Sequence, residues 1–312
     1  MSRLLLLLSL SAAAAFPITP LSRPDPLAAV QGSFDEGRYA EVVGGLSDES
    51  LQRLPSRELP RAYLLLGQSY WRLGQLDRAI GVLQLGVGLF PKDLPLLSNL
   101  GNVLHEVDLN DRASLMYARI LDRHPNNALA NLGLAEIDEA QGDLDASIRH
   151  YETCLREWKQ NPGIWRAYAD VLAQKRDFRA AGRAIEKSLA LSPDNVDSLQ
   201  FLADLQFQQG LIPDAHKTLA KASELAPERK DLPLRDSLWF LEEGNLRESM
   251  ARAQEVLEKF PDDPLGVWIR ASIALRRGNR EEARRDLRFV ASRSREAPFT
   301  SQVAASMLLQ MQ

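Results

Sequence analysis

The sequence predicts an all-α fold, a solenoid built from about eight helix–turn–helix repeats. Three observations point to it: proline, glycine and small residues recur 34 or 68 positions apart, apolar residues recur three and four positions apart within each period, and no segment alternates as a β-strand does. A chain of units that each pack on their neighbours also explains how 312 residues can form one body instead of two ordinary domains.

Small residues carry the clearest period. They stand at positions 79, 113, 147, 181, 215, 249 and 283, which hold Ala, Ala, Ser, Ala, Ala, Ser and Ala. Glycines share the spacing at 74, 142, 210, 244 and 278, and prolines do so at 91, 125, 193, 227 and 261. Small side chains allow two helices to approach closely, glycine adopts the left-handed conformation that ends a helix, and proline prevents a helix from continuing.

One unit shows how the period becomes a helix pair. In residues 60–93 a first helix has an apolar face that includes Gly67, and Gly74 ends that helix. A second helix carries Ala79 on the face that meets Gly67, and Pro91 stops it. Both small residues are therefore predicted to lie where the two helices cross.

This pattern resembles the tetratricopeptide repeat family over roughly residues 28–296, and the resemblance implies a right-handed α-solenoid. The expected units are a degenerate one at 28–59, regular ones at 60–93, 94–127, 128–161, 162–195 and 196–229, a divergent one at 230–261 and a last one at 262–295, with a capping helix at 297–312. In the divergent unit, Pro233, Asp236 and Ser237 occupy packing positions of the first helix. We therefore expect that helix to start late or to be short.

The N-terminus has the pattern of a secretory signal peptide. Arg3 is followed by an apolar run from Leu4 that ends in small residues, and we expect cleavage near Ala15. The run of 13 residues is short of the roughly 20 that span a bilayer. Residues 16–27 form a proline-rich leader outside the folded body. The alternative is a chance leucine run after a misassigned start codon.

Composition favours an exported helical protein and gives no support to an enzyme. The net charge is −4, which gives no sign of nucleic-acid binding, and the single Cys154 excludes an intramolecular disulfide. We expect a soluble protein of a bacterial periplasm or cell envelope. None of the four histidines has a second histidine three or four residues away, and Cys154 stands in register with small packing residues. We therefore expect no catalytic residue, no metal site and no cofactor.

The resemblance also implies a binding surface. In tetratricopeptide repeat proteins a second face of the first helices lines a concave groove that commonly binds a peptide. The positions of this chain that correspond to it include Gln68, Trp71, Asn102, Glu136, Glu139, Asp170, Asp204 and Phe207. Its middle is acidic and its flanks are aromatic, so we expect a neutral or basic extended partner segment. The alternative is that these are ordinary solvated helix residues.

The expected function is a non-enzymatic interaction scaffold or adaptor of the cell envelope. The alternative is an assembly subunit of a polysaccharide-export or secretion complex that contacts the polymer directly, which requires aromatic platforms along the groove. Arginines are concentrated near the C-terminus, at positions 270, 276, 277, 280, 284, 285, 288, 293 and 295. They form either a solvated, partly salt-bridged surface or a docking patch for an acidic partner or anionic lipid. The partner, the pathway and the oligomeric state stay open, and we expect membrane contact only through a complex.

Overall fold

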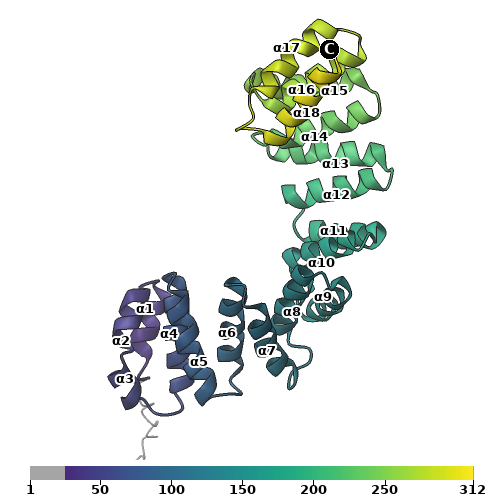
Figure 1. Ribbon diagram of the computed structural model, residues 1–312. Helices are drawn as coiled ribbons and strands as arrows, with labels where there is room; N and C mark the ends of the chain where they lie inside the picture. Colours follow the sequence, from purple (N-terminus) through teal and green to yellow (C-terminus); the bar gives the residue numbers. More distant parts are fainter. Residues whose placement is uncertain (1–24, 312) are drawn as a thin grey trace, which may run out of the picture. The chain divides into compact units, whose positions relative to one another are not determined.

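The computed structural model describes residues 25–311 (Figure 1). They divide into two compact units, and the boundary in the sequence falls between Asp108 and Leu109. These residues form eighteen α-helices and no strand, so the all-α prediction is confirmed. The predicted signal peptide and most of the predicted leader lie outside the described residues. Within residues 25–311, no helix has both the length and the apolar character that a membrane span requires.

The first unit contains six helices. They are α1 (Ala28–Asp35), α2 (Tyr39–Gly45), α3 (Asp48–Arg53), α4 (Leu59–Arg72), α5 (Leu76–Leu89) and α6 (Leu94–Glu106). Three short helices thus take the place of the degenerate unit, α4 and α5 form the first full pair, and α6 packs against both of them. The folded part begins before the expected boundary at residue 28, because Leu27 is only 1% exposed and Asp25 forms an ion pair with Arg61 at 2.7 Å.

The second unit contains twelve helices. They are α7 (Asn110–Leu121), α8 (Ala128–Gln141), α9 (Leu144–Glu157), α10 (Pro162–Gln174), α11 (Phe178–Leu191), α12 (Val196–Gln208), α13 (Ile212–Leu225), α14 (Asp231–Glu242), α15 (Leu246–Lys259), α16 (Pro264–Arg276), α17 (Arg280–Ala291) and α18 (Pro298–Gln310). From α8 to α17 each even-numbered helix pairs with the next helix in the chain, and each pair packs on the helix that follows it.

The turns inside the helix pairs keep one backbone conformation even where glycine is missing. The glycines of the 34-residue spacing have positive φ, from +71° at Gly74 to +81° at Gly142. Two positions of that spacing lack glycine, and there Asp108 and Arg176 take φ of 58° and 65°. They are the non-glycine residues with positive φ among residues 25–311. A side chain in this conformation costs roughly 1 kcal/mol, so the repeat geometry imposes the turn on residues that disfavour it.

The divergent unit corrects the expectation of a late or short first helix. Helix α14 begins at Asp231 and has 12 residues, one fewer than α12. Ser237 fits the crossing because its hydroxyl donates to the carbonyl of Ser249 at 2.6 Å, and Ser249 donates to the carbonyl of Ser237 at 2.8 Å. These reciprocal bonds satisfy both buried hydroxyls, so two serines replace the usual small apolar pair.

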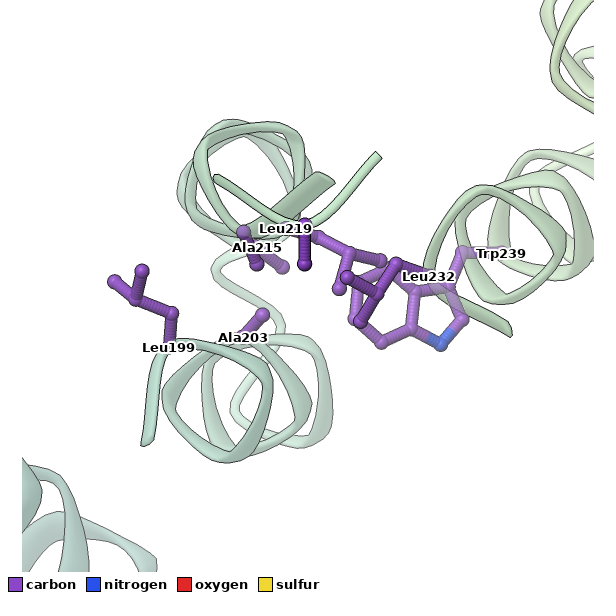
Figure 2. Close-up of a cluster of buried hydrophobic side chains, with 8 residues drawn as sticks. Leu199, Ala203, Ala215, Leu219, Leu232 and Trp239 are labelled. Atoms are coloured by element: carbon purple, nitrogen blue, oxygen red, sulfur yellow. The ribbon is translucent and has the colours of Figure 1, made fainter. Parts of the chain in front are cut away.

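The core lies between successive helices and continues from pair to pair. Figure 2 shows the cluster built by α12, α13 and α14, in which Leu219 of α13 reaches toward Leu232 and Trp239 of α14. Leu219 and Leu232 are fully buried. Burying one such side chain contributes about 2 kcal/mol, so α13 binds α14 chiefly through apolar contact. The other buried clusters of the second unit join successive helix pairs in the same way.

Helix α18 continues the repeat spacing as a first helix. Pro298 follows Pro264 by 34 residues, and α18 packs against both α16 and α17. The hydroxyl of Ser301 donates to the carbonyl of Val290 at 2.8 Å and fixes α18 on α17. Helix α18 thus packs on α17, and its capping role stays a prediction.

Candidate functional site

The predicted groove residues belong to both units, and each set is described by itself. In the first unit, Gln68 donates its amide to Asn99 at 2.9 Å, and the indole N–H of Trp71 donates to Glu106 at 2.5 Å. Both bonds link α4 to α6. Asn102 on α6 is half-buried. Trp71 is therefore half-buried and hydrogen-bonded to the next first helix, and it offers only part of its ring to a partner.

In the second unit, α8, α10 and α12 carry the other five predicted residues. We call the surface formed by Glu136 and Glu139 on α8, Asp170 on α10 and Asp204 and Phe207 on α12 the acidic face. Contacts 31 to 35 residues apart join these first helices, as when Gln174 of α10 donates to Glu139 at 2.6 Å. Neighbouring first helices thus present these positions side by side.

The carboxylate of Glu139 lies in a partly desolvated position. Burial raises its pKa above the ordinary value, and the charge of Asp170 raises it further. The hydrogen bond from Gln174 opposes both effects. Glu136 is exposed and Asp170 is half-buried. A cationic group placed beside Glu139 and Asp170 would replace lost hydration and relieve the repulsion between these two carboxylates.

At α12 the surface differs from the expectation. Asp204 forms an ion pair with Arg235 of α14 at 2.8 Å, so a cation within the chain already offsets its charge. Burial raises the pKa of Asp204, and Arg235 opposes the rise. Phe207 stacks on Trp239 with ring centroids 4.5 Å apart and planes 9° from parallel. It is partly buried against the core, so it is not the exposed aromatic residue that we predicted.

A cluster that the sequence did not reveal lies around His216 of α13. Its Nδ1 is 2.5 Å from the buried carboxylate of Asp236, and its Nε2 is 2.7 Å from Glu243. Arg252 of α15 binds the other oxygen of Asp236 at 2.9 Å, and the imidazole stacks on Phe240 with centroids 3.8 Å apart. Three contacts of His216, together with the ion pair of Arg252 and Asp236, make this a fixed connection between α13, α14 and α15. The signal in the sequence was Asp236 at a packing position.

Cys154 and His150, whose side chains could carry chemistry, are held in packing or hydrogen-bonded positions. Cys154 is fully buried, and burial raises the pKa of its thiol to about 11, so it is a packing residue as predicted. His150 contacts Asn131 at 2.8 Å, and burial lowers its pKa. Across residues 25–311 no three histidine, cysteine or carboxylate side chains gather in a way that could hold a metal ion.

Several of the C-terminal arginines take part in the packing of the last repeat. Arg270 makes a two-pronged ion pair with Asp286 at 2.7 and 2.9 Å. Arg276 donates to the carbonyl of Leu241, and Arg293 pairs with Asp262 and Glu296. These contacts fit the partly salt-bridged surface, the first of the two interpretations of the arginine-rich segment.

Comparisons with known proteins agree with this architecture. Tetratricopeptide repeat family models match residues 60–103, 99–162, 172–232 and 240–291, together more than half of the chain. A BBSome complex member from Bos taurus is 24% identical over 131 residues, which cover 42% of this chain and 25% of that protein. The chain spans less than half the length of the first curated relatives it matches.

Solved structures show the same fold. The C-terminal part of a tetratricopeptide repeat protein from Cytophaga hutchinsonii superposes with a TM-score of 0.67 at 16% identity and covers 77% of this chain and 97% of its own. YrrB, described as a tetratricopeptide repeat protein with an unusual peptide-binding site, superposes with a TM-score of 0.53 at 16% identity and covers 59% of this chain and 95% of its own.

Proposed function

Because the chain belongs to the tetratricopeptide repeat family, whose members are protein-interaction scaffolds, we propose that it is a non-enzymatic scaffold that binds a basic segment of a partner protein on the acidic face. The observation that carries the proposal is the proximity of Asp170 on α10 to Glu139 on α8, the helix that also carries the exposed Glu136. The peptide-binding site of the fold neighbour YrrB adds support.

The position of these carboxylates defines the partner's chemistry. Asp204 is offset by Arg235, so the negative charge centres on α8 and α10. Lysine or arginine side chains of an extended segment can reach these carboxylates, while its backbone bonds to amides such as Gln174. Affinity should fall as salt rises, because part of the attraction is between solvated charges.

We place this scaffold in the cell envelope of a bacterium, after removal of residues 1–15, and this placement rests on the N-terminal sequence pattern alone. Assembly of an envelope transport or export complex is the role we infer for it. Direct contact with a polysaccharide has less support, because Phe207 is stacked on Trp239 and Trp71 is half-buried.

The test uses fluorescence anisotropy with a labelled lysine-rich peptide and a glutamate-rich peptide of equal length. We expect the lysine-rich peptide to bind, and Glu136→Lys with Asp170→Lys to weaken it at least about tenfold. The control carries Glu186→Lys and Glu258→Lys, which change the same charge on the exposed second helices α11 and α15. Preference for the glutamate-rich peptide, or equal loss in both variants, would contradict the proposal.

A further inference from the structure

The charged side chains of α8, α10 and α12 are nearly all engaged within the chain. Glu139, for example, accepts a hydrogen bond from Gln174. The other engaged carboxylates of these helices are Glu136, Asp138, Asp197 and Asp204. Arg166 and Asp170 of α10 are the exceptions, because neither side chain forms a hydrogen bond or an ion pair within residues 25–311.

Arg166 is held by an aromatic ring and not by an acceptor. Its guanidinium carbon lies 5.7 Å from the ring centroid of Phe201 on α12, and its Nε is buried without a hydrogen-bond partner in residues 25–311. The two terminal nitrogens have no acceptor there either, but unlike Nε they are not buried. A cation–π contact uses none of the five N–H donors of an arginine. The cation is thus positioned by Phe201 with its donors still available to a ligand oxygen.

Asp170 lies one helical turn after Arg166. Residues four positions apart share one face of a helix and are about 6 Å apart along its axis. The two side chains do not pair with each other, and Asp170 instead lies near enough to Glu139 of α8 to raise the pKa of that carboxyl. Helix α10 therefore presents a cation and an anion side by side, and a ligand of a single charge sign complements only one of them.

We infer that Arg166 is a specificity-determining residue that binds a carboxylate side chain of the partner segment, while a lysine or arginine of the same segment binds Asp170 and Glu139. This inference rests on the proposed function and refines the chemistry of the partner. Alternate side chains of an extended chain point to the same side and are about 6.6 Å apart. This spacing matches the step of about 6 Å from Arg166 to Asp170, so the acidic and the basic residue of the segment are two positions apart.

The effect of a glutamate in the ligand has opposite signs with and without this role of Arg166. On a surface that offers only carboxylates, a glutamate next to the lysine weakens binding by repulsion. A guanidinium can instead form two parallel, charge-assisted hydrogen bonds to that glutamate, and these bonds are stronger than those between neutral groups. Glutamate then strengthens binding, and glutamine of nearly the same shape does not replace it.

The experiment measures fluorescence anisotropy of the full chain with three labelled peptides whose two ends are blocked. The first holds one lysine–serine–glutamate motif in a glycine–serine background. The second has glutamine in place of the glutamate, and the third has the composition of the first with the glutamate moved about eight positions from the lysine. We expect the first peptide to bind at least about fivefold tighter than each of the other two.

The variants assign this preference to one side chain. Arg166→Gln should abolish or reverse the preference for glutamate over glutamine, and Arg166→Lys should keep only part of it, because lysine retains the charge but not the two-pronged geometry. The matched control is Arg183→Gln, which removes the same charge from the exposed side of the second helix α11 and should keep the full preference. Urea titration verifies that each variant is folded, and the peptide comparison on the unchanged chain needs no substitution.

The outcomes differ for the two ideas. If the glutamine peptide binds the unchanged chain as tightly as the glutamate peptide and its binding depends on Asp170, the role of Arg166 is overturned and the proposed function stands. A preference for glutamate that persists in Arg166→Gln also overturns this role. If none of the peptides binds, both ideas are overturned. A dependence on Arg166 that appears only with peptides whose C-terminus is free would assign the arginine to a chain end and overturn the internal glutamate.

Discussion

Gly133 offers the sharpest test of how one repeat packs on the next. It lies on α8 against Tyr117 of α7, which is only 1% exposed. A Cβ at this glycine would stand 2.4 Å from the ring carbons Cε2 and Cζ and 2.8 Å from the hydroxyl oxygen. Non-bonded carbon atoms normally lie about 3.5–4 Å apart, so the buried ring must move by more than about 1 Å.

The expected cost of Gly133→Ala follows from these contacts. Overpacking a core costs about 1–3 kcal/mol, and a ring without free space belongs at the upper end. Alanine returns about 1 kcal/mol because it favours the helix more than glycine does. We therefore expect a net loss of about 2 kcal/mol in the free energy of unfolding, measured by urea titration with far-UV circular dichroism.

The control and the second substitution isolate the clash. Gly182→Ala adds the same methyl group on α11, where the nearest atom is Gln209 Nε2 at 3.9 Å, and it should stabilise by up to about 1 kcal/mol. Tyr117→Phe keeps both ring carbons and should not relieve Gly133→Ala, whereas Tyr117→Leu removes them and should. The reasoning is refuted if Gly133→Ala is as stable as Gly182→Ala, or if phenylalanine relieves the loss.

Four further predictions follow from single features. Arg176→Gly should raise the free energy of unfolding by about 1 kcal/mol because the native arginine has a positive φ, and Asp108→Gly should raise it by less because aspartate tolerates this conformation better. Urea titration measures both changes, and a loss of stability would contradict the imposed turn. Asp236→Ala should lower the free energy of unfolding by about 2 kcal/mol in the same assay, because Arg252 and His216 lose a buried carboxylate partner but stay partly hydrated. An unchanged urea midpoint would show that the cluster adds no stability. Cys154 should resist a thiol reagent at about pH 8 until the chain unfolds, because its pKa of about 11 keeps it neutral, and fast labelling of the folded protein would disprove this. Affinity for the lysine-rich peptide should be full at neutral pH and fall as pH drops through the raised pKa of Glu139, so a midpoint at or below the ordinary glutamate value would count against the buried carboxylate.

The repeat could be predicted because its signals are local. Any sequence with this period needs small residues such as Ala79 where two helices cross and turn glycines such as Gly74 where a helix ends. Asp108 and Arg176 interrupt the glycine series, yet both keep a positive φ, and at Arg176 the packing of α10 against α11 accounts for this conformation. Local conformational preference predicts glycine at most of these turns. Where another residue stands at the turn, tertiary packing sets the backbone conformation.

The surface could be predicted only in part, because it depends on contacts between repeats. Phe207 stands at a position of the repeat that is expected to line the groove. In the structure, Trp239 of α14 stacks on its ring. In the same way Arg235 offsets the charge of Asp204 by an ion pair, although the two residues are 31 positions apart. His216 and Asp236 come from different units of the repeat, so neither sequence position alone indicates their contact.

The proposed scaffold function requires that a partner protein binds on the first-helix surface of the second unit. Photo-crosslinking in cells tests it most directly, with a photoreactive phenylalanine analogue at Ala173 on α10, beside the acidic face, or at Ala190 on the exposed side of α11. We expect protein adducts from position 173 that disappear with Glu136→Lys, and no adducts from position 190. Adducts from position 190 with none from position 173 would contradict it.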